Sequence, residues 1–150
     1  MTYDQVFTLL NFSVVPAWAM LIFLPRAKLT ERLVHSALYP IVLGLFYMIG
    51  FGLILTGFGG AADVSFSSVA DISAAFSTPI GVLVGWSHYL VFDLFVGAWI
   101  GRDAQRRSIT HWLVAPALFF TFVLGPIGLL IYVCGRLLLR RTTMLSEEAG

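Results

Sequence analysis

The sequence predicts an all-α integral membrane protein, built as a bundle of four transmembrane helices. Of the 150 residues, 59% are hydrophobic and 11% are charged, and the mean hydropathy is +0.90. Soluble domains average about 45–50% apolar and about 25% charged residues, and a soluble globule of this size is too small to bury so much apolar surface. The length allows one membrane domain, covering residues 1–150.

Four apolar runs are each long enough to cross a bilayer, which takes about 20 residues. The expected helices cover residues 3–24, 33–56, 79–101 and 111–135. Pro116, Pro126 and the segment GPIG predict a bend in the fourth helix. Between the second and third helices, SVADISAAF (residues 68–76) fits either a short amphipathic helix on the membrane surface or an ordinary polar loop.

The distribution of lysine and arginine gives a conflicting orientation. Basic residues fill the first and third loops, which predicts that these loops are cytoplasmic and that both termini lie outside. A further cluster, Arg136, Arg140 and Arg141, follows the fourth helix, and an even number of spans places it on the opposite side. The N-terminus has no basic stretch or small-residue cleavage site typical of a signal peptide, so we expect a multi-pass protein of the bacterial inner membrane. A net charge of +1 without a basic face argues against nucleic-acid binding.

Two ionisable residues fall inside the third apolar run. Asp93 is the only acidic residue well within an expected span, and His88 lies nearest the middle of the same helix. An aspartate at mid-membrane costs about 2.5–3.5 kcal/mol on insertion scales, so a functional role is the default hypothesis. Residues 81–101 also contain GVLVG and GAWIG, whose glycines allow a neighbouring backbone to approach closely. This pattern makes a homodimer plausible.

The remaining histidines are expected in the same half of the bilayer as Asp93. His35 and His111 begin the second and fourth expected helices, next to the basic loops. Imidazole and carboxylate ligands suit iron or zinc, which predicts a metal site formed by His35, His88, Asp93 and His111. His88 and Asp93 are five residues apart, about 140° around a regular helix, so a shared ligand needs long reach or a π-bulge. The alternative is that these residues only form hydrogen bonds between helices.

Several segments resemble the abscisic-acid-deficient-four-like family of membrane proteins, which are required for neoxanthin synthesis in plants. The similar segments are LPRAKLTERL, YPIVLGLFY, GWSHYLVFDLF, RSITHWL and LGPIGLLIY. The resemblance covers nearly the whole chain, and the HxxxxD pattern of His88 and Asp93 is its most specific part. His111 matches the family pattern, whereas His35 stands where plant members have an acidic residue.

The resemblance implies a protein that acts on a carotenoid or apocarotenoid entering sideways from the lipid bilayer. We therefore expect a membrane-embedded, metal-dependent enzyme that uses iron, or alternatively zinc, for isomerisation or oxidative cleavage. His88 and Asp93 are the expected catalytic residues. The expected substrate contacts are Tyr39, Tyr89, Phe92 and Trp112. The alternative is a carotenoid-binding or assembly protein without turnover, while a transporter is less favoured because few polar residues are available to line a path.

Overall fold

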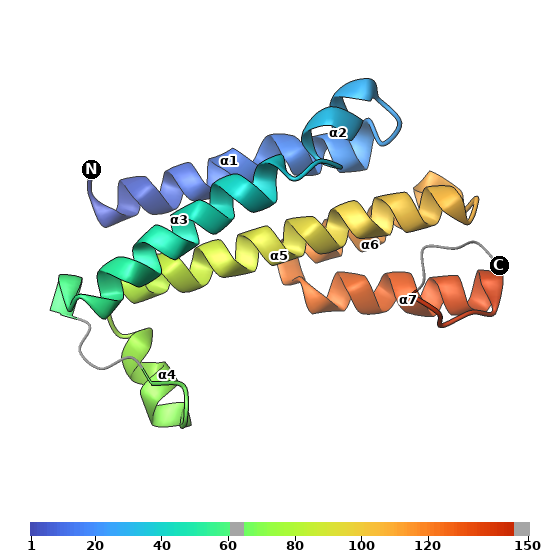
Figure 1. Cartoon of the computed structure of the whole chain (residues 1–150). Helices are drawn as coiled ribbons and strands as arrows, with labels where there is room; N and C mark the ends of the chain where they lie inside the picture. The colour runs from blue at the N-terminus through green and yellow to red at the C-terminus, as the bar shows by residue number, and fades with distance from the viewer. Residues whose placement is uncertain (61–64, 146–150) are drawn as a thin grey trace. The chain divides into compact units, whose positions relative to one another are not determined.

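The computed structural model describes residues 1–60 and 65–145, which form helices and no strands (Figure 1). The α-helices are α1 (Tyr3–Phe23), α2 (Lys28–Leu33), α3 (Leu38–Leu55), α4 (Val69–Ala75), α5 (Pro79–Arg106), α6 (His111–Leu124) and α7 (Pro126–Arg140), with a short 3-10 helix, η1 (Phe58–Gly60). The predicted all-α class is confirmed.

Three segments are long and apolar enough to cross a membrane: Tyr3–Phe23, Lys28–Leu55, which contains α2 and α3, and Pro79–Arg106. Large apolar side chains are exposed along them, among them Phe12, Val42 and Phe95. A helix that contacts lipid has apolar side chains on its outer surface, as these helices do. The first three expected spans, 3–24, 33–56 and 79–101, overlap these segments, although α3 begins at Leu38 and α5 continues to Arg106.

The fourth expected helix, 111–135, differs from the prediction. It is divided at Gly125, where φ is 53° and ψ is −103°, into α6 and α7. Pro126 stands at the first position of α7, where its missing N–H is not needed. At 14 and 15 residues, α6 and α7 are each about 21–23 Å long, short of the roughly 30 Å hydrocarbon core.

The helices α6 and α7 pack against each other as a hairpin, which Figure 1 shows in orange and red. The end of α7 returns to the loop between α5 and α6, because Arg140 Nη2 donates to the carbonyl oxygen of Ser108 at 2.8 Å. Arg107 Nη2 likewise donates to the carbonyl oxygen of Met144 at 3.3 Å. The third basic cluster thus lies at the same end of the unit as Arg102, Arg106 and Arg107, which removes the conflict in the orientation.

Contacts divide the chain into two compact units. The first unit contains Met1–Ser13 and Tyr39–Val91, and the second contains Val14–Leu38 and Phe92–Gly150. The expectation of a single membrane domain stays a prediction.

The first unit has a small apolar core where α3 packs on α5. Ile54, Ile80 and Val84 are buried there, with Tyr47 and Phe51 packed against them. A Cβ on Gly50 would lie 2.6 Å from Val84 Cγ2, so this crossing requires glycine. The short helix expected at 68–76 is present as α4, and Ser68 caps it by accepting a hydrogen bond from the backbone N–H of Asp71 at 3.1 Å.

The second unit packs α6, α7 and the end of α1 around the C-terminal half of α5. Trp18 and Leu21 are buried, and a Cβ on Gly97 would lie 2.5 Å from Trp18 Cη2. The Trp18 ring also packs against Phe122, with 5.3 Å between ring centroids. Gly97 therefore accommodates a tryptophan side chain, where the GAWIG pattern predicted the approach of a backbone.

Candidate functional site

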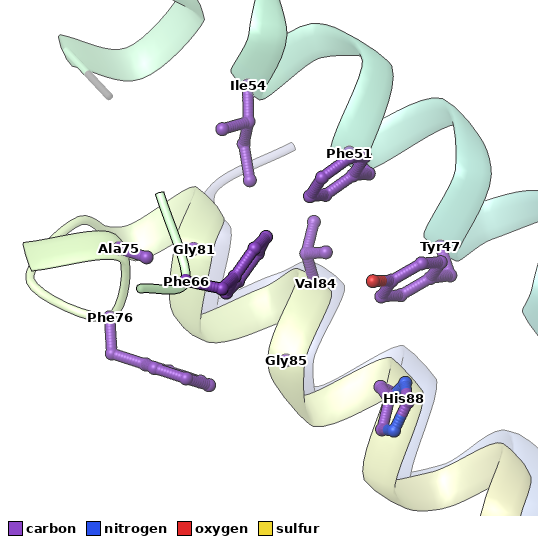
Figure 2. Close-up of a pocket in the computed structure, with 10 residues that line it drawn as sticks. All are labelled: Tyr47, Phe51, Ile54, Phe66, Ala75, Phe76, Gly81, Val84, Gly85 and His88. Atoms are coloured by element: carbon purple, nitrogen blue, oxygen red, sulfur yellow. The ribbon is translucent and has the colours of Figure 1, made fainter. Parts of the chain in front are cut away.

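The first unit contains a pocket of about 230 Å³ between α3, α4 and α5. Figure 2 shows the ten residues that line it: Tyr47, Phe51, Ile54, Phe66, Ala75, Phe76, Gly81, Val84, Gly85 and His88. His88 is the one histidine among them, and Tyr47 carries the one phenol. The pocket is an aromatic slot with two polar groups.

The wall on α3 is a ladder of aromatic rings. Tyr47 and Phe51 are one helical turn apart and stack with 5.9 Å between centroids and 8° between planes. Phe66, from the loop before α4, continues the ladder at 6.3 Å from Phe51 and 19°. Flat, nearly parallel rings of this kind offer π-faces to a flat conjugated ligand.

His88 packs beside this ladder, with its ring 5.6 Å from that of Tyr47 and inclined at 52°. Both lie at one end of the pocket, and Ala75 and Phe76 lie at the other (Figure 2). Along α5, Gly81 and His88 are seven residues apart, which gives the pocket a length of about 10 Å. The side chain of His88 is exposed in this unit, so a ligand can reach it from the lipid.

Two glycines of α5 make room for α4. A Cβ on Gly81 would collide with the carbonyl oxygen of Ala75, and a Cβ on Gly85 would lie 2.6 Å from Phe76 Cζ. The edge at Phe66 is fixed by Asp71, because Ser65 Oγ donates to Asp71 Oδ2 at 2.9 Å and Ser67 Oγ donates to it at 3.3 Å. These hydrogen bonds, of which the one from Ser65 has the largest effect, hold the pKa of the Asp71 carboxyl below its usual range.

The other expected site residues lie elsewhere. Tyr39, at the start of α3, and Tyr89, which stacks on Trp86 at 5.0 Å, belong to the first unit but do not line the pocket. Phe92 and Trp112 belong to the second unit and are 56% and 81% exposed.

Asp93 lies in the second unit, at the break of the α6–α7 hairpin. A Cβ on Gly125 would be 2.8 Å from Asp93 Oδ2 and 2.9 Å from Asp93 Oδ1. The N-terminus of α7 begins at this point, and its helix dipole favours a negative charge. The carboxylate therefore lies next to the turn between α6 and α7, and the catalytic role that the sequence predicts for it stays a prediction.

The two remaining histidines, His35 and His111, each have a polar contact within the second unit. His111 Nε2 donates to the carbonyl oxygen of Ile22 at 2.7 Å, and His35 Nδ1 lies 3.4 Å from Arg102 Nη1. Across the described ranges, 1–60 and 65–145, no three His, Cys, Asp or Glu side chains are grouped closely enough to hold a metal ion. The iron or zinc site of His35, His88, Asp93 and His111 stays a prediction.

Comparison with known proteins gives one family. The model of ABA DEFICIENT 4-like proteins matches residues 5–132. The chain belongs to this family. It is 26% identical over 133 residues to the protein ABA DEFICIENT 4, chloroplastic, of Arabidopsis thaliana, a match that covers 84% of this chain and 58% of that protein. No solved structure matches the chain.

The match to the ABA DEFICIENT 4-like family confirms the resemblance that the sequence segments indicate. The chain spans little more than half the length of its Arabidopsis relative. The apolar helices indicate a membrane protein. Its location in a bacterial inner membrane and the homodimer stay predictions.

The pocket also includes residues that the sequence analysis did not single out. Tyr47, Phe51, Phe66 and Phe76 form most of its wall. Tyr47 lies in the segment YPIVLGLFY, and its spacing of four from Phe51 places both rings on one face of α3. That spacing was the available signal, but the chain has 13 phenylalanines and similar pairs occur in lipid-facing positions.

Proposed function

We propose that this chain binds one end of a carotenoid or apocarotenoid in the aromatic pocket of the first unit and catalyses its isomerisation or oxidative cleavage. The observation that carries the proposal is the ladder Tyr47–Phe51–Phe66 ending beside the imidazole of His88. The substrate class comes from the ABA DEFICIENT 4-like family.

The size of the pocket decides which part of the ligand enters. Pockets that enclose a whole drug-sized molecule measure about 300–1,000 Å³, and this one measures about 230 Å³ over a short stretch of α5. A C40 polyene is too long for it, so the pocket receives one end group and the remaining chain lies along the lipid-exposed helices. Entry is lateral, because the ligand dissolves in the bilayer.

His88 and Tyr47 give the pocket its chemistry. Isomerisation of a polyene end group removes a proton from one carbon and delivers a proton to another atom. A neutral imidazole carries one acceptor and one donor nitrogen, and a phenol can both donate and accept. We assign proton removal to His88 and proton delivery to Tyr47, which lies against it.

The sequence predicts a metal-dependent reaction, which requires side chains that can hold the metal ion. Catalytic zinc sites use about three protein ligands, and the described residues bring together no such group. Oxidative cleavage by iron is therefore the less favoured form of this proposal. Metal analysis of the purified protein tests it: stoichiometric iron or zinc that disappears in His88→Ala supports a metal enzyme.

A second candidate function is binding of the pigment without turnover. It is favoured by the apolar character of the lining, in which only Tyr47 and His88 carry polar side-chain groups. Such a protein would present the polyene to a separate enzyme.

Expression of the full chain in carotenoid-producing bacteria, followed by chromatography of total and protein-bound pigments, separates these functions. We expect a new pigment with the wild type, which His88→Phe abolishes while bound pigment remains. Phe51→Ala should lose bound pigment, whereas Phe95→Ala, an exposed aromatic outside the pocket, should not. Bound pigment without a new pigment would support binding without turnover. The absence of both a bound pigment and a new pigment would contradict both candidate functions.

A further inference from the structure

A second pocket, of different chemistry, lies in the second unit. It has a volume of about 360 Å³ and lies beside the turn Pro25–Ala27 that follows α1. Its polar lining consists of Arg26, Glu31, His35, Arg102 and Gln105. The aromatic pocket, by contrast, is mainly apolar.

The polar pocket lies at the level of the lipid headgroups. The 21 residues of α1 measure about 31 Å, the thickness of the hydrocarbon core. The turn after α1 therefore emerges among the headgroups. Trp112, at the start of α6 in the same unit, is 81% exposed, as expected for a tryptophan at the interface.

The pocket belongs to the basic part of the chain, and its lining has two arginines, Arg26 and Arg102, against one carboxylate, Glu31. All nine lysine and arginine residues of the chain belong to the second unit. They are Arg26, Lys28, Arg32, Arg102, Arg106, Arg107, Arg136, Arg140 and Arg141. Basic residues close to an anionic leaflet are attracted to it electrostatically.

The lining side chains of the pocket carry more hydrogen-bond donors than acceptors. Arginine cannot accept a hydrogen bond, so Arg102 Nη1 donates to His35 Nδ1 at 3.4 Å. A neutral His35 ring then carries its proton on Nε2, and this nitrogen is buried without a hydrogen-bond partner. Gln105 Nε2 is also a donor, at 3.0 Å from the carbonyl oxygen of Pro25.

We propose that this pocket binds a phosphate group, the feature shared by phospholipid headgroups and free phosphate. Phosphate only accepts hydrogen bonds, and guanidinium groups bind it through two parallel hydrogen bonds. Arg26 and Arg102 contribute guanidinium groups to the lining, and His35 contributes a ring whose Nε2 is buried without a hydrogen-bond partner, while Glu31 is the carboxylate of the lining that opposes an anion. This site is independent of the polyene pocket and of the proposed reaction.

Native mass spectrometry of the full chain in detergent tests the assignment, with phosphatidylglycerol, phosphatidylcholine and inorganic phosphate as separate probes. We expect phosphatidylglycerol to remain bound, with at least tenfold weaker binding of phosphatidylcholine. Equal binding of inorganic phosphate would identify the free ion as the ligand and still support the site. Binding of none of the three would overturn it.

Variants distinguish specific binding in this pocket from a general attraction of anionic lipid to the positive charges of the protein. Arg102→Gln should weaken phosphatidylglycerol binding about tenfold, and Arg32→Gln, which removes the same charge outside the pocket, should change it less than twofold. Glu31→Gln should strengthen binding, a gain that misfolding cannot produce. Equal losses in Arg102→Gln and Arg32→Gln, or weaker binding in Glu31→Gln, would contradict the proposal.

Discussion

Arg136 on α7 donates through Nη1 to Oδ2 of Asp103 on α5 at 2.9 Å, and both side chains are buried. The hydroxyl of Tyr132 donates to the same oxygen at 2.6 Å, and Arg107 Nε donates to Oδ1 at 3.0 Å. The Arg136 guanidinium also lies 5.7 Å from the centre of the Trp99 ring, within cation–π range. One carboxylate thus fixes the end of α7 against the end of α5.

Replacing Asp103 with asparagine should destabilise the protein by about 3–5 kcal/mol, because the change leaves the buried Arg136 charge without its counter-ion. The free energy of unfolding in detergent measures this loss. Asp4→Asn, at the exposed start of α1, is the matched control and should stay within about 0.5 kcal/mol of the wild type. Similar stabilities for the two variants would show that the carboxylate does not hold the hairpin.

The same connection predicts the membrane topology. With three spans and an α6–α7 hairpin, the C-terminal region lies on the side of the α5–α6 loop, and the N-terminus lies on the other. Single cysteines at Thr2, Gln105 and Met144, in a Cys134→Ser background, can be labelled in sealed vesicles with an impermeant maleimide. We expect Gln105 and Met144 to react from one side and Thr2 from the opposite side. Labelling of Met144 together with Thr2 would instead require a fourth span.

Hydropathy alone predicted the first three long helices but could not distinguish a fourth span from a hairpin. The segments next to Gly125 on both sides, FFTFVL (residues 119–124) and PIGLLIY (residues 126–132), are apolar, so hydropathy does not mark the reversal. Two signals were present: the GPIG segment, which predicted only a bend, and the Arg136 cluster on the unexpected side. The break at Gly125 and Pro126 accounts for the first signal, and the contact of Arg136 with Asp103 accounts for the second.

The aromatic pocket was harder to predict, because it depends on contacts between residues distant in sequence. His88 was singled out as an ionisable group in an apolar run, but its neighbour Tyr47 belongs to another helix. Asp93 was singled out by the same reasoning, and it lies beside Gly125. The cost of burying a charge indicates that a residue has a partner, but it does not indicate which one.

Gly125 should be essential to the hairpin. Its φ of 53° with ψ of −103° is unfavourable for other residues, and a Cβ would collide with the Asp93 carboxylate. Gly125→Ala should lower the free energy of unfolding by about 1–3 kcal/mol. Gly135→Ala, within α7 and with no atom within 4 Å of its Cβ, is the control and should be neutral or stabilising. Equal effects of both substitutions would show that the turn is not strained.

Filling the aromatic pocket should block the ligand without unfolding the protein. Gly85→Leu places a side chain against the Phe76 ring, inside the lining. We expect protein-bound pigment to fall at least tenfold, as measured by absorbance after purification. Gly52→Leu on α3, where a Cβ meets nothing within 4 Å, should retain the pigment. Pigment retained in Gly85→Leu would place the polyene outside this pocket.

Low pH should destabilise the loop before α4, at the edge of the aromatic pocket, because it protonates Asp71. Hydrogen bonds from Ser65 and from its neighbours hold the pKa of this carboxyl below the ordinary value of 3.8. Its contribution to the folded loop is therefore complete above about pH 4 and is lost as the pH falls through the lowered pKa. Since the same loop carries Phe66, pigment retention by the wild type should fall below pH 3.8. Asp71→Asn should bind pigment more weakly at neutral pH and lack this acid step, and an identical acid profile in both proteins would assign the step to another group.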